Sequence, residues 1–132
     1  MDSSLWIDSF RSATGPAGKE LGRLIEEEVA LAVTGVVVTE VVQGFIRDAS
    51  SVEHYLAKFD MLEPQGFSTY LNAAAISRIA RSKGISLATI DALIAAVALE
   101  YDAVVFTLDK DFSHVARITS LRLHEMADDR AT

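Results

Sequence analysis

Apolar residues along this chain recur at helical spacing in some segments and in short continuous runs in others. The helical spacing predicts a short helix that Ser3 or Ser4 caps, and four amphipathic helices over residues 19–30, 50–60, 67–81 and 112–117. Apolar runs predict strands at residues 31–34 and 103–108, with a short strand ended by Pro64 and a last strand at residues 120–126. Because strands alternate with helices, we expect a three-layer α/β fold with a parallel sheet.

Two apolar segments do not follow a simple amphipathic pattern. Residues 87–102 are rich in alanine and apolar on nearly every side, which predicts a buried helix. Residues 35–45 are ambiguous, because their β-branched side chains favour a strand whereas Val37, Val41 and Phe45 fit the stripe of a helix.

Length and composition set broad limits on the kind of protein. A chain of 132 residues without internal repeats or a Pro/Gly-rich linker is expected to form one domain, residues 1–132. It contains no cysteine, which excludes disulfides, thiolate metal sites and a cysteine nucleophile. Its longest apolar run, residues 92–99, is far shorter than the ~20 residues of a membrane span. The N-terminus has no basic region, so we expect no signal peptide, no membrane association and a cytoplasmic location.

Acids interrupt or follow apolar sequence at four places: Asp2, Glu40, Asp91 and the pair Asp109 and Asp111. Asp109 stands where the predicted strand 103–108 ends, and sites in parallel α/β folds lie beyond the carboxyl ends of the strands. We therefore expect the four places to meet at one end of the sheet. Taken singly, each also has a plain structural interpretation. Asp91 would favour a helix N-terminus, Glu40 would lie on a solvated helix face, and Asp111 would belong to a loop or cap a helix.

Several carboxylates in one pocket need a counter-charge. Oxygen ligands without cysteine or histidine favour Mg²⁺ or Mn²⁺ over zinc. The three histidines, His54, His114 and His124, share no ligand spacing. A metal pair held by carboxylates suits in-line attack of water on a phosphodiester, so the residue chemistry predicts a metal-dependent phosphoryl-transfer site.

Three stretches resemble the PIN-domain family, specifically its VapC-type ribonuclease toxins: DSSLWIDSF (2–10), TEVVQGF (39–45) and TIDALIAAVALEYDAVVFTLDKDF (89–112). The resemblance extends from residue 2 to about residue 126. It implies a central parallel sheet with helices on both faces, Mg²⁺-dependent endoribonuclease activity on structured RNA such as tRNA or rRNA loops, and a cognate VapB-type antitoxin. It also implies a homodimer, and a helix for residues 35–45.

Residue by residue, the resemblance assigns roles within the site. It implies three direct metal ligands: Asp2, Asp91 and Asp109. Glu40 would be a ligand or orient the attacking water, and Asp111 would be an outer ligand. Ser4 and Thr107 match the family's supporting polar residues. Water attack on phosphorus would leave a 5′-phosphate and a 3′-hydroxyl. The family usually carries a short strand before its first aspartate, whereas here only Met1 precedes Asp2, so either the native chain begins upstream or that strand is almost absent.

The net charge of −7 by itself argues against a nucleic-acid binder, which usually presents a basic face. Setting aside the five site acids leaves −2, and two Mg²⁺ ions would add +4, so the rim around the site would be near neutral or positive. Five basic residues are candidates for that rim: Arg11, Arg47, Arg78, Arg81 and Lys83. For each of them, a solvated helix residue is the plainer and preferred interpretation. The alternative function is a PIN-like module that binds RNA or a partner without cutting.

One apolar group has two interpretations. Leu5, Trp6 and Ile7, together with Phe45 and Tyr55, either pack in the core or form a groove for an antitoxin helix.

Overall fold

A computed structural model describes residues 15–45, 47, 49–107 and 109–124 of the chain. These residues form two compact units, one ending at Met61 and the other comprising Leu62–His124. Each unit buries its own set of apolar side chains, and each is described by itself. Within the described part, every helix is too short or too polar to cross a membrane. The helix predicted before Gly15, with Trp6 and Phe10, lies outside the described residues.

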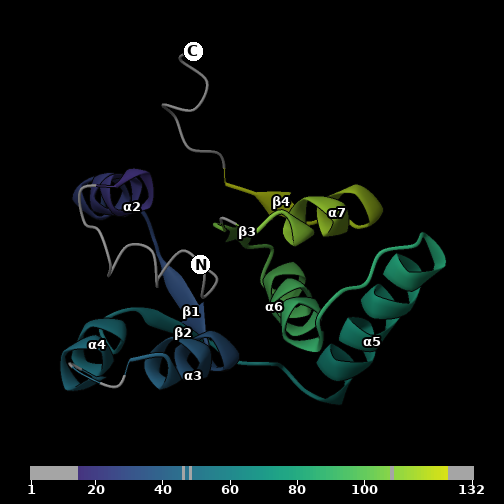
Figure 1. Ribbon diagram of the computed structural model, residues 1–132, viewed down its shortest axis with the longest axis horizontal. Helices are drawn as coiled ribbons and strands as arrows, with labels where there is room; N and C mark the ends of the chain where they lie inside the picture. The colour runs from purple at the N-terminus through teal and green to yellow at the C-terminus, as the bar shows by residue number, and fades with distance from the viewer. Residues whose placement is uncertain (1–14, 46, 48, 108, 125–132) are drawn as a thin grey trace, which may run out of the picture. The chain divides into compact units, whose positions relative to one another are not determined.

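In its described residues, the first unit contains three helices and a pair of strands (Figure 1). In chain order these are α2 (Pro16–Glu26), β1 (Ala32–Thr34), α3 (Gly35–Gln43), α4 (Ala49–Leu56) and β2 (Asp60–Leu62), which pairs with β1. Strand β1 confirms the strand predicted at residues 31–34, and its Val33 is buried.

Helix α3 resolves the ambiguity of residues 35–45. The segment is helical, and Val37 and Val41 on one of its faces are completely buried. The strand preference of the β-branched residues is overridden, because the helix places these two valines four residues apart on the same face. The helical interpretation is therefore confirmed.

Helix α2 differs from the predicted helix at both ends. It begins at Pro16, three residues before Lys19, because a proline is well suited to the first helical position. It ends at Glu26, not near residue 30, and Glu28 then adopts the left-handed conformation with φ 58°. Val29, which the predicted helix 19–30 includes, follows this turn and is 44% exposed.

Helix α4 also differs from its prediction. It begins at Ala49, so Ser50 lies inside the helix and not at its cap. It ends at Leu56, four residues before the predicted end, because Asp60 is already part of β2 and pairs with β1. Pairing of β2 with β1 therefore ends the helix earlier than its apolar pattern predicts.

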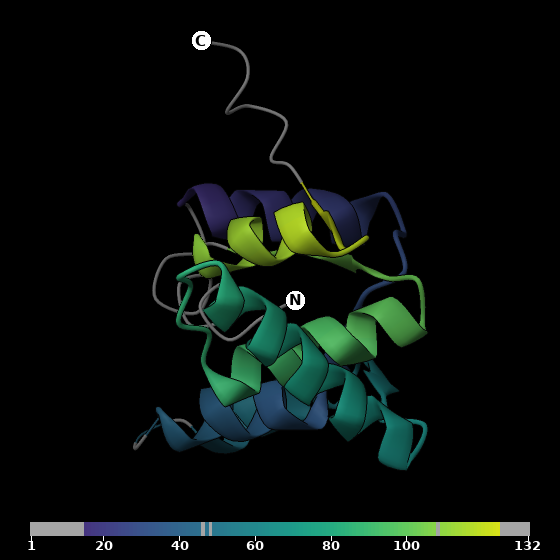
Figure 2. The same ribbon diagram turned by 90° about the vertical axis from the view of Figure 1, so that its right-hand side faces the viewer.

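The second unit comprises α5 (Phe67–Ser82), α6 (Thr89–Glu100), β3 (Val104–Val105), α7 (Asp111–Ile118) and β4 (Arg122–Leu123). Helices α5 and α6 lie side by side in both views (Figures 1 and 2). The predicted helix 67–81 is confirmed with one further residue, and its end is marked by Gly84 at φ 77°.

Helix α6 confirms the prediction of a buried alanine-rich helix. Its buried residues are mostly alanines: Ala92, Ala95, Ala96 and Ala98, with Ile94 and Val97. These short side chains allow α5 to approach closely, and α5 contributes the buried Ala73, Ile76 and Ala80.

The parallel pairing predicted from the alternation of strands and helices is present in β3 and β4. Val104 lies opposite Arg122, and Val105 lies opposite Leu123. Both strands are shorter than predicted, since the sequence predicts strands over residues 103–108 and 120–126. Val104 is 44% exposed, so β3 does not have the fully buried character expected of an interior strand. In the described ranges the strands form two separate pairs, β1 with β2 and β3 with β4.

Candidate metal centre

Three aspartates meet in the second unit. Asp91, Asp109 and Asp111 each offer one carboxylate oxygen, and these oxygens lie within 4.8 Å of one another. All three residues are half-buried. They come from two places far apart in the sequence, so the fold and not the local chain brings Asp91 to the other two. The predicted meeting of these three acids is present in the structure.

The neighbouring elements explain how each carboxylate is placed. Asp91 lies in the first turn of α6, and the buried residues that follow it hold that helix in the unit. Asp109 follows β3, and Asp111 is the first residue of α7. Phe112, directly after Asp111, is completely buried and fixes the start of α7.

Two local hydrogen bonds shape the turn between β3 and α7. The Asp109 backbone N–H donates to the Thr107 hydroxyl oxygen at 2.9 Å. The Asp111 backbone N–H donates to Asp109 Oδ1, also at 2.9 Å. Thr107 therefore helps to position the Asp109 backbone, and its supporting role in a site remains a prediction. The second oxygen of Asp109, Oδ2, takes no part in this bond, which leaves it available to a ligand.

The charges at this place favour a cation. Two unit charges about 4.8 Å apart repel by about 3–4 kcal/mol at an effective dielectric constant of about 20. Neither Asp109 nor Asp111 has an ion pair with a lysine or arginine of the described ranges. A hard divalent cation would offset the repulsion, and carboxylate oxygens are the ligands that Mg²⁺ and Mn²⁺ prefer. The donor set thus fits such an ion.

The carboxylates also have the helix-end roles that the sequence suggests for single acids. Asp91 and Asp111 both stand in the first turn of a helix, where a negative charge is favourable. Asp109, and not Asp111, provides the side-chain oxygen that accepts a hydrogen bond at the start of α7. A helix-end position and a metal-ligating role are compatible for the same carboxylate.

The remaining predicted site residues are not part of this cluster as described. Glu40 is half-buried on α3 in the first unit, and its place beside the three aspartates remains a prediction. Asp2 and Ser4, like Arg11, lie outside the described residues.

Other polar and aromatic residues have roles away from the aspartates. His124 contacts the ring of Phe106, with the ring centroids 4.6 Å apart. Tyr70 on α5 is 52% exposed. Tyr55 and Phe45 of the suggested groove are half-buried, whereas its other three members fall outside the described ranges.

Sequence reasoning did not single out one further feature. Arg78 and Arg81, named only among five basic candidates, both line a cavity of about 680 Å³ in the second unit. The cavity also includes Thr89, two residues before Asp91. The sequence signal for it is weak: hydroxyl residues occur on both sides of Gly84 and the two arginines precede it, with no fixed motif.

The chain is similar in sequence to known proteins of one family. A sequence model of the PIN domain matches residues 1–118. The chain is 32% identical over 126 residues to VapC ribonuclease Mb1587 of Mycobacterium bovis, an alignment that covers 92% of this chain and 94% of the relative. Ribonuclease VapC11 from two strains of Mycobacterium tuberculosis matches with the same identity and coverage. On the match to the family model and on this similarity, the chain belongs to the PIN-domain family.

Proposed function

We propose that this protein is a Mg²⁺-dependent endoribonuclease toxin that cleaves structured RNA and is neutralised by a cognate VapB-type antitoxin. The observation that carries the proposal is the cluster of Asp91, Asp109 and Asp111 in a chain similar to VapC ribonucleases. Membership of the family supports a nuclease, and three hard oxygen donors within 4.8 Å support a divalent cation.

Within this proposal, Asp91 and Asp109 are direct ligands of the cation and Asp111 is an outer ligand. Asp2 and Glu40 complete the acidic set from the first part of the chain. When bound, the cation supplies positive charge that polarises the scissile phosphate and promotes attack by water. Asp109 offers Oδ2, because its Oδ1 is held by the Asp111 N–H. Thr107 keeps the Asp109 backbone in place, so that this oxygen does not have to reorganise when the substrate arrives.

The proposal includes the architecture and assembly of the protein. Residues 1–132 form a single PIN domain with a central parallel sheet and helices on both faces. The protein acts in the cytoplasm as a homodimer, on loops of tRNA or rRNA. These points follow the family that the chain belongs to.

Cleavage of total bacterial RNA by the purified full chain tests the proposal. We expect cleavage with Mg²⁺ or Mn²⁺, none in EDTA, and 5′-phosphate ends on the products. Asp109→Asn should abolish cleavage, because it removes one charged ligand while keeping the hydrogen-bond acceptor at Oδ1. Asp102→Asn is the matched control: Asp102 is 94% exposed and pairs with Arg122, away from the cluster. RNA binding without cleavage under every metal condition would instead support the non-catalytic alternative.

A further inference from the structure

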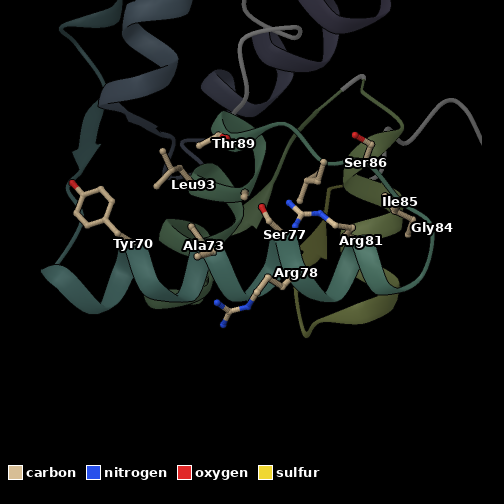
Figure 3. Close-up of a pocket in the computed structure, with 13 residues that line it drawn as sticks. Tyr70, Ala73, Ser77, Arg78, Arg81, Gly84, Ile85, Ser86, Thr89 and Leu93 are labelled. Carbon is tan, nitrogen blue, oxygen red and sulfur yellow. The ribbon is translucent and has the colours of Figure 1, made fainter.

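The cavity of about 680 Å³ lies between α5, the segment after Gly84 and the first turns of α6 (Figure 3). Its lining combines apolar and polar side chains. The members that matter here are Ser77, Arg81, Ile85, Ser86, Thr89 and Leu93. No aspartate or glutamate lines it among the described residues, although the chain carries a net charge of −7. The lining of the cavity therefore carries a local positive charge, although the protein as a whole is acidic.

Arg78 and Arg81 are the charged residues that line the cavity, and Arg81 is the one that points into it. In Figure 3 its guanidinium group lies beside Ser77 and points toward the segment that leads from α5 to α6, whereas Arg78 extends to the other side of α5. Arg81 is exposed, and it forms no ion pair with a carboxylate of the described ranges. A guanidinium group without a partner, next to hydroxyl groups, is suited to bind a phosphate.

The cavity and the three aspartates share the first turn of α6. Thr89 lines the cavity, and Asp91 belongs to the acidic cluster. Residues two apart in a helix point about 200° away from each other, and a helix is about 10–12 Å wide with its side chains. The cavity is thus about one helix width from the cation-binding acids, a separation that an RNA strand passing the end of α6 would span.

We infer that this cavity binds a nucleotide of the RNA substrate next to the scissile phosphate. Its phosphate contacts Arg81, with Ser77 and Thr89 as hydroxyl donors, and its sugar and base lie against Ile85 and Leu93. The inference rests on the proposed function and deepens it, because it assigns a substrate contact outside the acidic cluster. It also accounts for RNA binding by a protein with a pI near 4.8: the positive charge is local, and the acids are covered by cations.

Binding of a short, fluorescein-labelled, single-stranded RNA of mixed sequence tests the inference by fluorescence anisotropy at several salt concentrations. The titrations use an Asp109→Asn background, so that the probe is not cut. Arg81→Gln should weaken binding by about threefold to tenfold and reduce the slope of log K against log[salt] by about 0.7, the loss of one phosphate contact. Arg81→Lys should retain the slope, because it keeps the charge.

Two further variants make the result specific. Arg117→Gln removes the same charge from an exposed position in the last turn of α7, outside the cavity lining, and should change neither affinity nor slope. Ser86→Glu places a carboxylate in the cavity from an exposed loop position and should weaken binding at least as much as Arg81→Gln. Because Arg81, Ser86 and Arg117 are all exposed, each variant should fold, which circular dichroism verifies.

The outcomes separate this inference from the proposed function. If the unaltered protein cleaves RNA but Arg81→Gln binds the probe with unchanged affinity and salt slope, the cavity is not a substrate site and the nuclease proposal stands. If Arg81→Gln loses binding while the unaltered protein never cleaves RNA, the cavity is an RNA site and the nuclease proposal fails. An effect of Arg81→Gln on antitoxin inhibition alone would assign the cavity to the partner protein and overturn the inference.

Discussion

Replacing Asp109 with asparagine should stabilise the metal-free protein and remove its response to Mg²⁺. Asparagine keeps the shape of the side chain and an oxygen that can accept the hydrogen bond from the Asp111 N–H. What it loses is one negative charge within 4.8 Å of two others. The substitution is therefore a nearly pure test of charge.

The magnitude follows from the geometry. Each of the two lost repulsions is about 3–4 kcal/mol at an effective dielectric constant of about 20. Asp109 is half-buried, so water and salt screen most of this, and we expect about 1–2 kcal/mol of added stability. For a chain of 132 residues this corresponds to a rise in Tm of about 3–8 °C without metal. In the unaltered protein, Mg²⁺ at ten times its Kd should stabilise by about 1.4 kcal/mol.

Thermal unfolding followed by circular dichroism, in EDTA and in Mg²⁺, measures both effects. We expect Asp109→Asn to have the higher Tm in EDTA and no shift on addition of Mg²⁺. Asp102→Asn, which removes an exposed carboxylate, should behave as the unaltered protein does. A lower Tm in EDTA together with an unchanged Mg²⁺ shift would refute the idea that these carboxylates repel one another and hold a cation.

Three further predictions concern packing and charge. Phe112→Ala should cost about 3–5 kcal/mol because Phe112 is completely buried, whereas Phe67→Ala, at a position 78% exposed, should change the free energy of unfolding by less than about 0.5 kcal/mol in urea titrations. Arg23→Met should lower the Tm by several degrees, because Arg23 donates two hydrogen bonds, at 2.7 and 2.8 Å, to the buried carboxylate of Glu20, and adding Glu20→Gln should restore part of the loss. Burial raises the pKa of Tyr55 above its ordinary 10.0, so its neutral form contributes stability that is lost as the pH rises through the raised value. An ultraviolet titration should show one tyrosine ionising at higher pH than the others, and Tyr55→Phe should remove that step.

Much of the second unit could be predicted from the sequence, because its signals are local and strong. The alanine-rich pattern of residues 87–102 indicates a buried helix in any context, and Lys83-Gly84 marks the end of α5 through a left-handed glycine. The acids of TLDKDF follow a strand-forming run, and their meeting with Asp91 follows from the topology of parallel strands and helices.

The ends of elements were less predictable, because tertiary pairing decides them. Helix α4 could have continued past Leu56 on its own pattern, but Asp60 pairs in β2. Residues 103–108 look like one continuous strand, yet of the residues described there, only Val104 and Val105 pair with β4. The Arg81 cavity could not be predicted at all, since it depends on how the chain after Gly84 returns along α5.

The turn from Thr107 to Asp111 has a consequence for what a metal titration would report. Two of the three carboxylates are carried by this turn, which its own hydrogen bonds hold in shape, so little ordering remains to be done there when a cation binds. Asp91 arrives on α6, a separate element that packs against β3 and α7. The affinity for the cation therefore depends on how firmly α6 packs against the rest of its unit. Substitutions of buried alanines in α6 do not alter a carboxylate. They should nevertheless weaken Mg²⁺ binding before they cause measurable unfolding.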